Sequence, residues 1–278
     1  MQVENGIRGA YGLALSGVDE AADLLVEASD DWPRVELAWR LGEGDLDQEE
    51  VTETRASLRL KTGGRIELDR DAGRAVYVVQ RPLSAEELVH PYLVPVAAVM
   101  AHWHGRECVH AGAFVGDSGV WGVVGERESG KSSTLARLAL DGVPVISDDL
   151  LALQGSSVFP GPRAIDLREE AAERLGVGSS IGIAGARERW RLRLGPVEPG
   201  LELRGWFHLA WGERVEAVPL EGGERVARLL AQRAARLPSA TPEELLDLAS
   251  LPSWELRRPQ RWESLGEAAD CLRGLADG

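Results

Sequence analysis

Eight residues near the middle of the chain have the types and the spacing of a loop that binds phosphate. The run GERESGKS, residues 125–132, matches the pattern G-x-x-x-x-G-K-[ST] at every fixed position. Its glycines let the backbone curl so that N–H groups point at phosphate oxygens, and a helix that starts here adds its positive N-terminal end. Lys131 would reach the β- and γ-phosphates, and the Ser132 hydroxyl would be a ligand of Mg²⁺. Glu126 and Glu128 would have to turn outward, because carboxylates repel bound phosphate.

The flanking sequence and the composition favour a nucleotide-phosphate site over an ordinary turn. An apolar stretch at 120–124 predicts a strand before the loop, and 132–140 predicts an amphipathic helix after it, which is the context that such a loop requires. Of 31 basic residues only Lys61 and Lys131 are lysine, so a lysine stands where a compact ammonium suits phosphate better than a guanidinium does. The residues of this segment predicted to bind the nucleotide are Gly125, Glu128, Ser129, Gly130, Lys131, Ser132 and Ser133.

Two adjacent carboxylates, Asp148 and Asp149, follow the next predicted strand, 143–147. The carboxyl ends of strands line the ligand crevice of an open α/β sheet, so we expect this pair beside the loop. One carboxylate can hold Mg²⁺, for which we select Asp148 together with Ser132, and the other can accept a proton from an attacking hydroxyl. Which of the two is the base stays open, and the structural alternative is that they only cap the next segment. His110 is the third candidate catalytic residue, because it lies on the predicted strand paired with the one before the loop and could orient or tune the base.

A metal site of another kind is also conceivable from residue types alone. His102, His104, Cys108 and His110 are all zinc-ligand types within nine residues. His102 and His104 would project in different directions from a helix end, where a cation simply suits the helix dipole. We therefore do not favour zinc.

The elements that would position these residues change in character near residue 84. Before it, alternating segments predict a β-meander in a small α+β region, with a helix at 18–28; the strands are expected at 35–39, 57–61, 65–68 and 75–80. Ser84 and Glu87 have the spacing of a capping box and predict a mostly buried helix to about residue 103. A hairpin at 107–124 then leads into the loop.

The remainder of the chain predicts further strands and helices around the loop. Strands are expected at 150–153, 203–211 and 214–218, and Thr241, Pro242 and Glu244 announce a helix. The Gly-rich stretch 176–186 has no clear periodicity and is expected to be a loop. We predict two domains: residues 1–84, and a nucleotide-binding catalytic domain at 85–278.

Composition excludes several classes of partner. The 278 residues are 44% hydrophobic and 27% charged, as in an ordinary globular protein, and the net charge of −14 argues against nucleic acid or anionic membrane as partners. The longest apolar run, 92–101, is half of the ~20 residues that a membrane-spanning helix needs, and no secretory signal is visible. Two cysteines far apart, Cys108 and Cys271, make no disulfide framework. We expect a cytoplasmic protein whose partners are proteins, peptides or small molecules.

Three motifs in this order resemble the C-terminal catalytic domain of HPr kinase/phosphorylase. They are VHAGA at 109–113 with its hairpin, the loop at 125–133, and VISDD at 145–149. The segment FPGPRAIDL at 159–167 resembles one in shorter HPr-kinase-like proteins, several of which are encoded with ribosomal-peptide biosynthesis genes. Two features depart from the family: Ser133 replaces a glutamate, and the glycine-rich signature of phosphorolysis is not recognisable around Arg163.

The resemblance implies a fold and an activity. The fold would be an α/β P-loop domain of the HPr-kinase/PEP-carboxykinase type with a mixed sheet, preceded by a small β-rich region that could recognise the acceptor. The activity would be an ATP- and Mg²⁺-dependent kinase that phosphorylates a serine hydroxyl of a peptide or small protein. Lys131 and Ser132 would bind phosphate and metal, one of Asp148 and Asp149 would be the base, and His110 would support it.

Some alternatives stay open at this stage. Arg163, Arg187 and Arg189 could stabilise the transferring phosphoryl group, and Arg163 is the best candidate because it follows the acidic pair closely. A nucleotide-binding regulatory protein without phosphotransfer would share the loop, and a kinase for a small hydroxylated metabolite would share every motif. A homo-oligomer is also possible.

Overall fold

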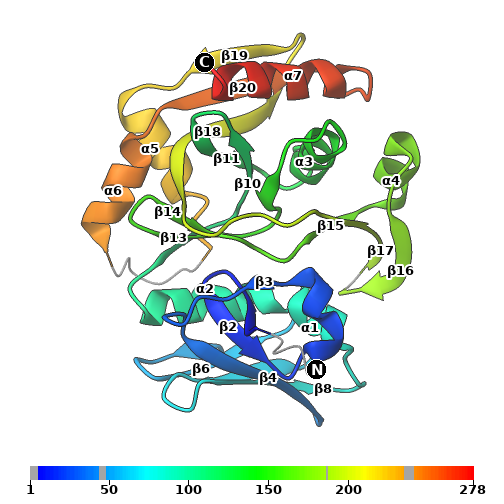
Figure 1. The fold of residues 1–278 in the computed structure, drawn as a ribbon, viewed down its shortest axis with the longest axis vertical. Helices are drawn as coiled ribbons and strands as arrows, with labels where there is room; N and C mark the ends of the chain where they lie inside the picture. Colours follow the sequence, from blue (N-terminus) through cyan, green and yellow to red (C-terminus); the bar gives the residue numbers. More distant parts are fainter. Residues whose placement is uncertain (1–5, 44–47, 186, 235–240) are drawn as a thin grey trace.

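Two large β-sheets dominate the computed structural model, which describes residues 6–43, 48–185, 187–234 and 241–278 (Figure 1). Together with a third, small sheet and eight helices in the described ranges they make a mixed α/β fold, as expected. The N-terminal sheet lies at the bottom of the view in Figure 1, and the sheet that leads into the predicted phosphate loop lies at the top. No helix in the described part of the chain is long and apolar enough to cross a membrane.

The N-terminal sheet has the order β3-β1-β2-β4-β8-β7-β6-β5. Its strands are β1 (Arg8–Ala10), β2 (Leu13–Ser16), β3 (Val26–Glu27), β4 (Arg34–Leu41), β5 (Glu50–Val51), β6 (Arg55–Arg59), β7 (Arg65–Asp69) and β8 (Arg74–Val79). The alternating segments are all strands, and β6, β7 and β8 form the predicted meander. β4 instead pairs with β8 in parallel, so it does not continue the meander.

The helix predicted at 18–28 is wrong in type and length. The chain forms only a 3-10 helix, η1 (Asp19–Leu24), and then enters β3. Ala21 departs from helical geometry with φ −111° and ψ 21°, and Leu25 is extended. The segment buries Ala21 and Leu24 against the sheet without completing an α-helix, so packing overrides its helix propensity.

The single helix predicted from Ser84 to about 103 is two helices, α1 (Ala85–Val89) and α2 (Leu93–Trp103). The capping box is confirmed: the Ser84 hydroxyl accepts from the Glu87 N–H at 3.2 Å, and the Glu87 carboxylate accepts from the Ser84 N–H at 3.1 Å. Pro91 ends the first helix, because a residue before proline is pushed out of helical geometry. Both helices share one core with the N-terminal sheet, so the packing does not change at residue 84; the division into domains stays a prediction.

The second large sheet has the order β12-β10-β11-β18-β14-β13-β9, and β20 extends it by pairing with β18 and β19. The strands are β9 (Glu107–Val109), β10 (Ala111–Gly116), β11 (Gly119–Gly125), β12 (Val145–Ser147), β13 (Leu151–Gln154), β14 (Ser157–Phe159), β18 (Leu201–Trp211), β19 (Glu216–Pro219) and β20 (Ser253–Arg258). The β10–β11 hairpin is confirmed, and β11, β18 and β20 are parallel. β12 is antiparallel to β10 and so runs in the direction of β11. The carboxyl ends of these four strands therefore lie on one edge of the sheet.

Helices cover both faces of this sheet. The helices are α3 (Lys131–Leu140) and α7 (Ser264–Ala276), which share one core cluster, and α5 (Gly222–Leu230) and α6 (Pro242–Ser250), which share another. The helix announced by Pro242 is present, but the carboxylate of Glu244 accepts from the Gly155 N–H at 2.9 Å instead of completing a capping box.

The third sheet has the order β15-β17-β16, and one helix lies between β15 and β16 in the sequence. Its strands are β15 (Ala164–Leu167), β16 (Ser179–Ala184) and β17 (Arg187–Arg193), and the helix is α4 (Glu169–Leu175). The loop expected at 176–186 is therefore wrong for most of its length, because β16 pairs with β17 despite its serines and glycine. Ala186 lies outside the described residues.

Candidate functional site

The predicted phosphate loop connects β11 directly to α3. Gly130 has φ +86°, the left-handed conformation that glycine adopts without strain, and it precedes the first residue of the helix. No side chain within the described ranges caps α3, so the first N–H groups of this ten-residue helix are available to an anion at the loop. The Ser129 hydroxyl is buried beside Gly125, where a Cβ would collide with it, and no described residue hydrogen-bonds to it. These features match the strand, loop and helix expected from the sequence.

The acidic side chains of the loop do not concentrate negative charge at the helix start. Glu126 and Glu128 are both exposed. Glu128, which has φ +70°, accepts a hydrogen bond from Arg168 Nη2 at 2.7 Å, and this partner lowers the pKa of its carboxyl. Its charge is therefore compensated on the solvent side, which does not support the nucleotide contact predicted for Glu128.

Lys131 and the acidic pair meet at the carboxyl ends of β11 and β12. Lys131 is 8% exposed; its ammonium donates to the Asp148 carbonyl and lies 3.7 Å from Oδ1 of Asp148 and 3.7 Å from Oδ1 of Asp149. Residues that are 17 and 18 positions apart in the sequence thus form one cluster of a cation and two anions. A cation that is shared between two carboxylates can turn to a phosphate that arrives at the loop.

The two carboxylates have different surroundings. The side chain of Asp148 is 3% exposed, and burial raises its pKa to about 6 although Lys131 and the Ser132 hydroxyl favour its ionised form. The side chain of Asp149 is 34% exposed; partial burial opposes its ionisation, but the Lys131 charge and the neighbouring imidazoles outweigh this and lower its pKa. Asp148 is thus an inner group beside the loop, and Asp149 is the one that a second substrate can reach.

The residues beside Asp148 fit a hard cation. Its Oδ1 is buried and has no hydrogen-bond partner in the part of the chain that the structure describes, and the Ser132 hydroxyl lies within hydrogen-bonding reach of the same carboxylate. Mg²⁺ typically takes one or two protein oxygens and completes its shell with water and substrate phosphate, and these two oxygens suit that role. No group of three or more His, Cys, Asp or Glu side chains that could hold a metal ion is found in the described ranges.

His110 lies near the acidic pair, but not on a strand. The residue falls between β9 and β10, because β9 pairs with β13 and not with the strand before the loop. Its imidazole is exposed and within hydrogen-bonding reach of the Asp149 backbone. Partial desolvation and the Lys131 ammonium lower the pKa of its imidazole. This position is compatible with the supporting role proposed for it.

The guanidinium of Arg163 donates hydrogen bonds to backbone carbonyls. Its side chain is buried, and its guanidinium donates to the carbonyls of Val145, Ile146 and Gly195 at 2.7–3.0 Å. These bonds hold β12, which carries the acidic pair, against the chain that follows β17. The contacts of Arg163 therefore support a structural role and give no support to its proposed contact with phosphate. Ser133, in the first turn of α3, is half-buried.

The other two candidate arginines lie on β17, which carries a row of four on one face. Arg187, Arg189, Arg191 and Arg193 alternate along this strand. The charge of Arg187 acts on Arg127, Arg168 and Glu128 around the loop, and that of Arg189 acts on Asp149. The two-residue spacing in the sequence indicates that the next arginine, Arg191, lies on the same face of the strand as Arg187 and Arg189.

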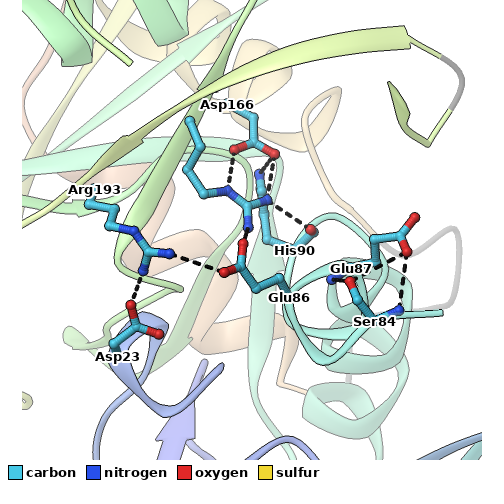
Figure 2. A network of polar contacts seen from close by, with 8 residues as sticks. Asp23, Ser84, Glu86, Glu87, His90, Asp166 and Arg193 are labelled. Carbon is cyan, nitrogen blue, oxygen red and sulfur yellow. Dashed lines mark hydrogen bonds and ion pairs between the residues drawn. The ribbon is translucent and has the colours of Figure 1, made fainter. Parts of the chain in front are cut away.

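A network of polar contacts that links β15 and β17 to α1 and η1 (Figure 2) is not marked in the sequence, and through His90 it reaches Asp149. His90 is 3% exposed, and its Nε2 lies 3.8 Å from Oδ2 of Asp149 and 3.4 Å from Oδ2 of Asp166. Arg191 holds Asp166 through two bonds of 2.7 and 2.8 Å and also donates to the His90 carbonyl and to Glu86. His90 is marked in the sequence only by the proline that follows it, which indicates a helix end and no chemistry.

Replacing Arg191 by methionine is expected to lower the free energy of unfolding by about 3–5 kcal/mol, because Asp166, which is 6% exposed, would keep a buried charge without its partner. The matched control is Arg193→Met. Arg193 pairs with Asp23 and Glu86 but is 50% exposed, so its loss should change stability by less than about 1 kcal/mol. Urea unfolding of both variants measures the difference, and equal small effects would show that the network does not hold Asp166.

A cavity of about 700 Å³ opens beside this network. Its walls come from the N-terminal sheet and its turns, from the start of α1 and from β16; they include Thr62, Arg81, Glu86, Ile181, Ile183 and Arg191. Glu86 and Arg191 belong to both the cavity and the network. Arg191 pairs with Asp166, and Asp166 and Asp149 both lie beside His90, so these contacts connect the wall of the cavity to Asp149.

Among the comparisons with known proteins, the one with solved structures finds a similar protein. No family model matches the chain, and no curated protein matches it. Among solved structures, the chain is similar to the Hpr(Ser) kinase/phosphatase from Coxiella burnetii, with 11% sequence identity over 61% of this chain and 95% of that chain, at a TM-score of 0.31. This similarity is distant and does not establish membership of that family.

Proposed function

We propose that the protein is an ATP- and Mg²⁺-dependent kinase that phosphorylates a serine hydroxyl of a peptide or small protein. The observation that carries this proposal is the single cluster in which the Lys131 ammonium lies 3.7 Å from both Asp148 and Asp149, at the start of an uncapped helix. Phosphotransfer needs a base that the acceptor hydroxyl can reach, whereas a loop that only senses nucleotide does not. Asp149, whose side chain is 34% exposed, is a carboxylate that can act as this base.

Each residue of the cluster has a task in this reaction. The N–H groups at the start of α3 and the Lys131 ammonium bind and neutralise the β- and γ-phosphates. Ser132 and Asp148 are the residues that would hold Mg²⁺, which supplies positive charge to the phosphate oxygens when bound. Asp149 accepts the proton of the acceptor hydroxyl as its oxygen attacks the γ-phosphorus, the bond to the β–γ bridging oxygen breaks, and ADP leaves. His110 positions the backbone that carries this base.

The cavity beside the network supports a peptide as the acceptor. It combines apolar side chains of β16 with charged groups of α1 and the N-terminal region, and it shares Glu86 and Arg191 with the network that reaches Asp149. A peptide bound in this cavity would contact Glu86 and Arg191, which connect through Asp166 and His90 to Asp149. Because residues of the N-terminal region line the cavity, this supports the proposal that residues 1–84 recognise the acceptor.

Incubation of the full chain with γ-labelled ATP, Mg²⁺ and separate pools of peptides and hydroxylated metabolites tests the proposal. We expect label on peptide serines, located by mass spectrometry, and loss of transfer when the metal is chelated. Label on metabolites alone would replace the acceptor class. Tight nucleotide binding with no transfer to either pool would favour a regulatory protein and contradict the kinase.

A further inference from the structure

A buried arginine without an acidic partner lies beside the loop. Arg258, the last residue of β20, is 6% exposed, and in the described ranges its guanidinium forms no ion pair with a carboxylate. Among the described residues its Nε has no hydrogen-bond partner, and its Nη1 makes two long contacts there, 3.4 Å to the Pro259 carbonyl and 3.4 Å to the Ser264 hydroxyl. A buried charge that is neither paired nor fully hydrogen-bonded is unfavourable, so this arrangement indicates a missing anion.

The position of Arg258 follows from the parallel strands. β11, β18 and β20 run side by side, and they end at Gly125, at Trp211 and at Arg258. Trp211 and Arg258 are register partners on the last two strands. A ligand bound at the loop of β11 would extend over the carboxyl ends of β18 and β20, where such sheets place their ligands.

Contacts at Gly130 bring both side chains to the loop. A Cβ at this position would collide with the guanidinium of Arg258 and would lie 3.5 Å from Cη2 of Trp211. Arg258 and Trp211 thus pack against the backbone of the residue that precedes Lys131. A ligand with its phosphates at Lys131 has this pair as its neighbour on the side of β18.

The Trp211 indole packs against the Arg258 guanidinium and is partly accessible to solvent. The Arg258 Cζ lies 4.5 Å from the ring centroid, which is a cation–π contact, and the residue remains 40% exposed. An indole that packs on a guanidinium and is also accessible to solvent can stack with another flat aromatic ring. Adjacent to a phosphate loop, the ring that fits this description is a nucleobase.

We propose that Trp211 and Arg258 form the base end of the nucleotide site. The nucleobase of a nucleoside triphosphate stacks on Trp211, while the guanidinium of Arg258 supports the indole and neutralises phosphate charge at Gly130. This inference rests on the proposed nucleotide-dependent function, and it assigns residues that no motif marks. It predicts that the protein distinguishes a nucleotide from a phosphate chain that lacks a base.

Calorimetric titration with two probes tests the assignment: Mg·ATP, and Mg·tripolyphosphate, which has the phosphates without the base. We expect the unaltered protein to bind ATP at least about tenfold more tightly than tripolyphosphate, and Trp211→Ala to remove that difference by weakening ATP alone. Trp211→Phe should keep most of it. Trp39→Ala is the matched control, since Trp39 is 39% exposed on the N-terminal sheet and its loss should change neither affinity.

Arg258→Gln should weaken both probes by about tenfold, because it removes a charge that contacts phosphate, and Arg258→Lys should restore part of the loss. The inference is overturned, with the proposed function intact, if the unaltered protein binds both probes equally, if Trp211→Ala weakens both equally, or if Arg258→Gln and Arg258→Lys change neither affinity. Failure of the unaltered protein to bind either probe overturns the proposed function and this inference together. Thermal unfolding of each variant identifies any loss that comes from misfolding.

Discussion

Asp149→Asn is expected to reduce phosphotransfer by about a thousandfold, because an amide of the same shape cannot accept the proton of the acceptor hydroxyl. Asp149 is the more accessible member of the acidic pair, with 34% of its side chain exposed against 3% for Asp148. The change leaves the loop amides and Lys131 in place, so the affinity for ATP should change by less than about threefold. Initial rates with the identified acceptor and a separate nucleotide titration measure the two effects.

Asp148→Asn should give a different pattern. Loss of a buried metal ligand raises the Mg²⁺ concentration needed for half-maximal rate by at least about tenfold, and high Mg²⁺ recovers part of the rate. Asp141→Asn is the control, because Asp141 ends α3 away from the loop and pairs with Arg137 at the surface. Full activity in Asp149→Asn, or rescue of Asp149→Asn by Mg²⁺, would contradict the assignment of Asp149 as the base.

The parts of the site that the sequence could predict are those formed by neighbours in the chain. The loop, the strand before it, the helix after it and the strand that ends at Ser147 lie where patterns of polarity and glycine predicted them. Their local order is sufficient, because a strand, a tight loop and a helix in succession place a lysine at the helix start whatever the rest of the chain does. The capping box at Ser84 is local in the same way.

The parts that could not be predicted depend on which strands lie side by side. Arg258 and Trp211 reach the loop only because β18 and β20 pair in parallel with the strand before it, and this pairing leaves no periodicity in the sequence. His90 meets Asp149 because a proline ends a helix that the apolar pattern extended to about residue 103. β16 is a strand whose serines and glycine favour a loop, and its partner β17 decides its structure. Long-range pairing, not local propensity, sets these positions.

Lys131→Arg is expected to weaken ATP binding by at least about tenfold and phosphotransfer by about a hundredfold, although the charge is unchanged. Lys131 is 8% exposed, and its ammonium contacts the Asp148 carbonyl. It also lies 3.7 Å from one carboxylate oxygen of Asp148 and 3.7 Å from one of Asp149. A planar guanidinium is broader than an ammonium, and it would form fixed pairs with the carboxylates instead of turning to the phosphates.

The chain provides its own control for this substitution, because its other lysine is Lys61. Lys61 is exposed, so Lys61→Arg should leave ATP affinity, turnover and unfolding unchanged. Lys131→Met completes the series by removing the charge. If Lys131→Arg behaves like the unaltered protein and only Lys131→Met fails, then charge alone matters at this position. The survival of a lysine among 29 arginines would then carry no information about phosphate, since arginine would serve equally well there.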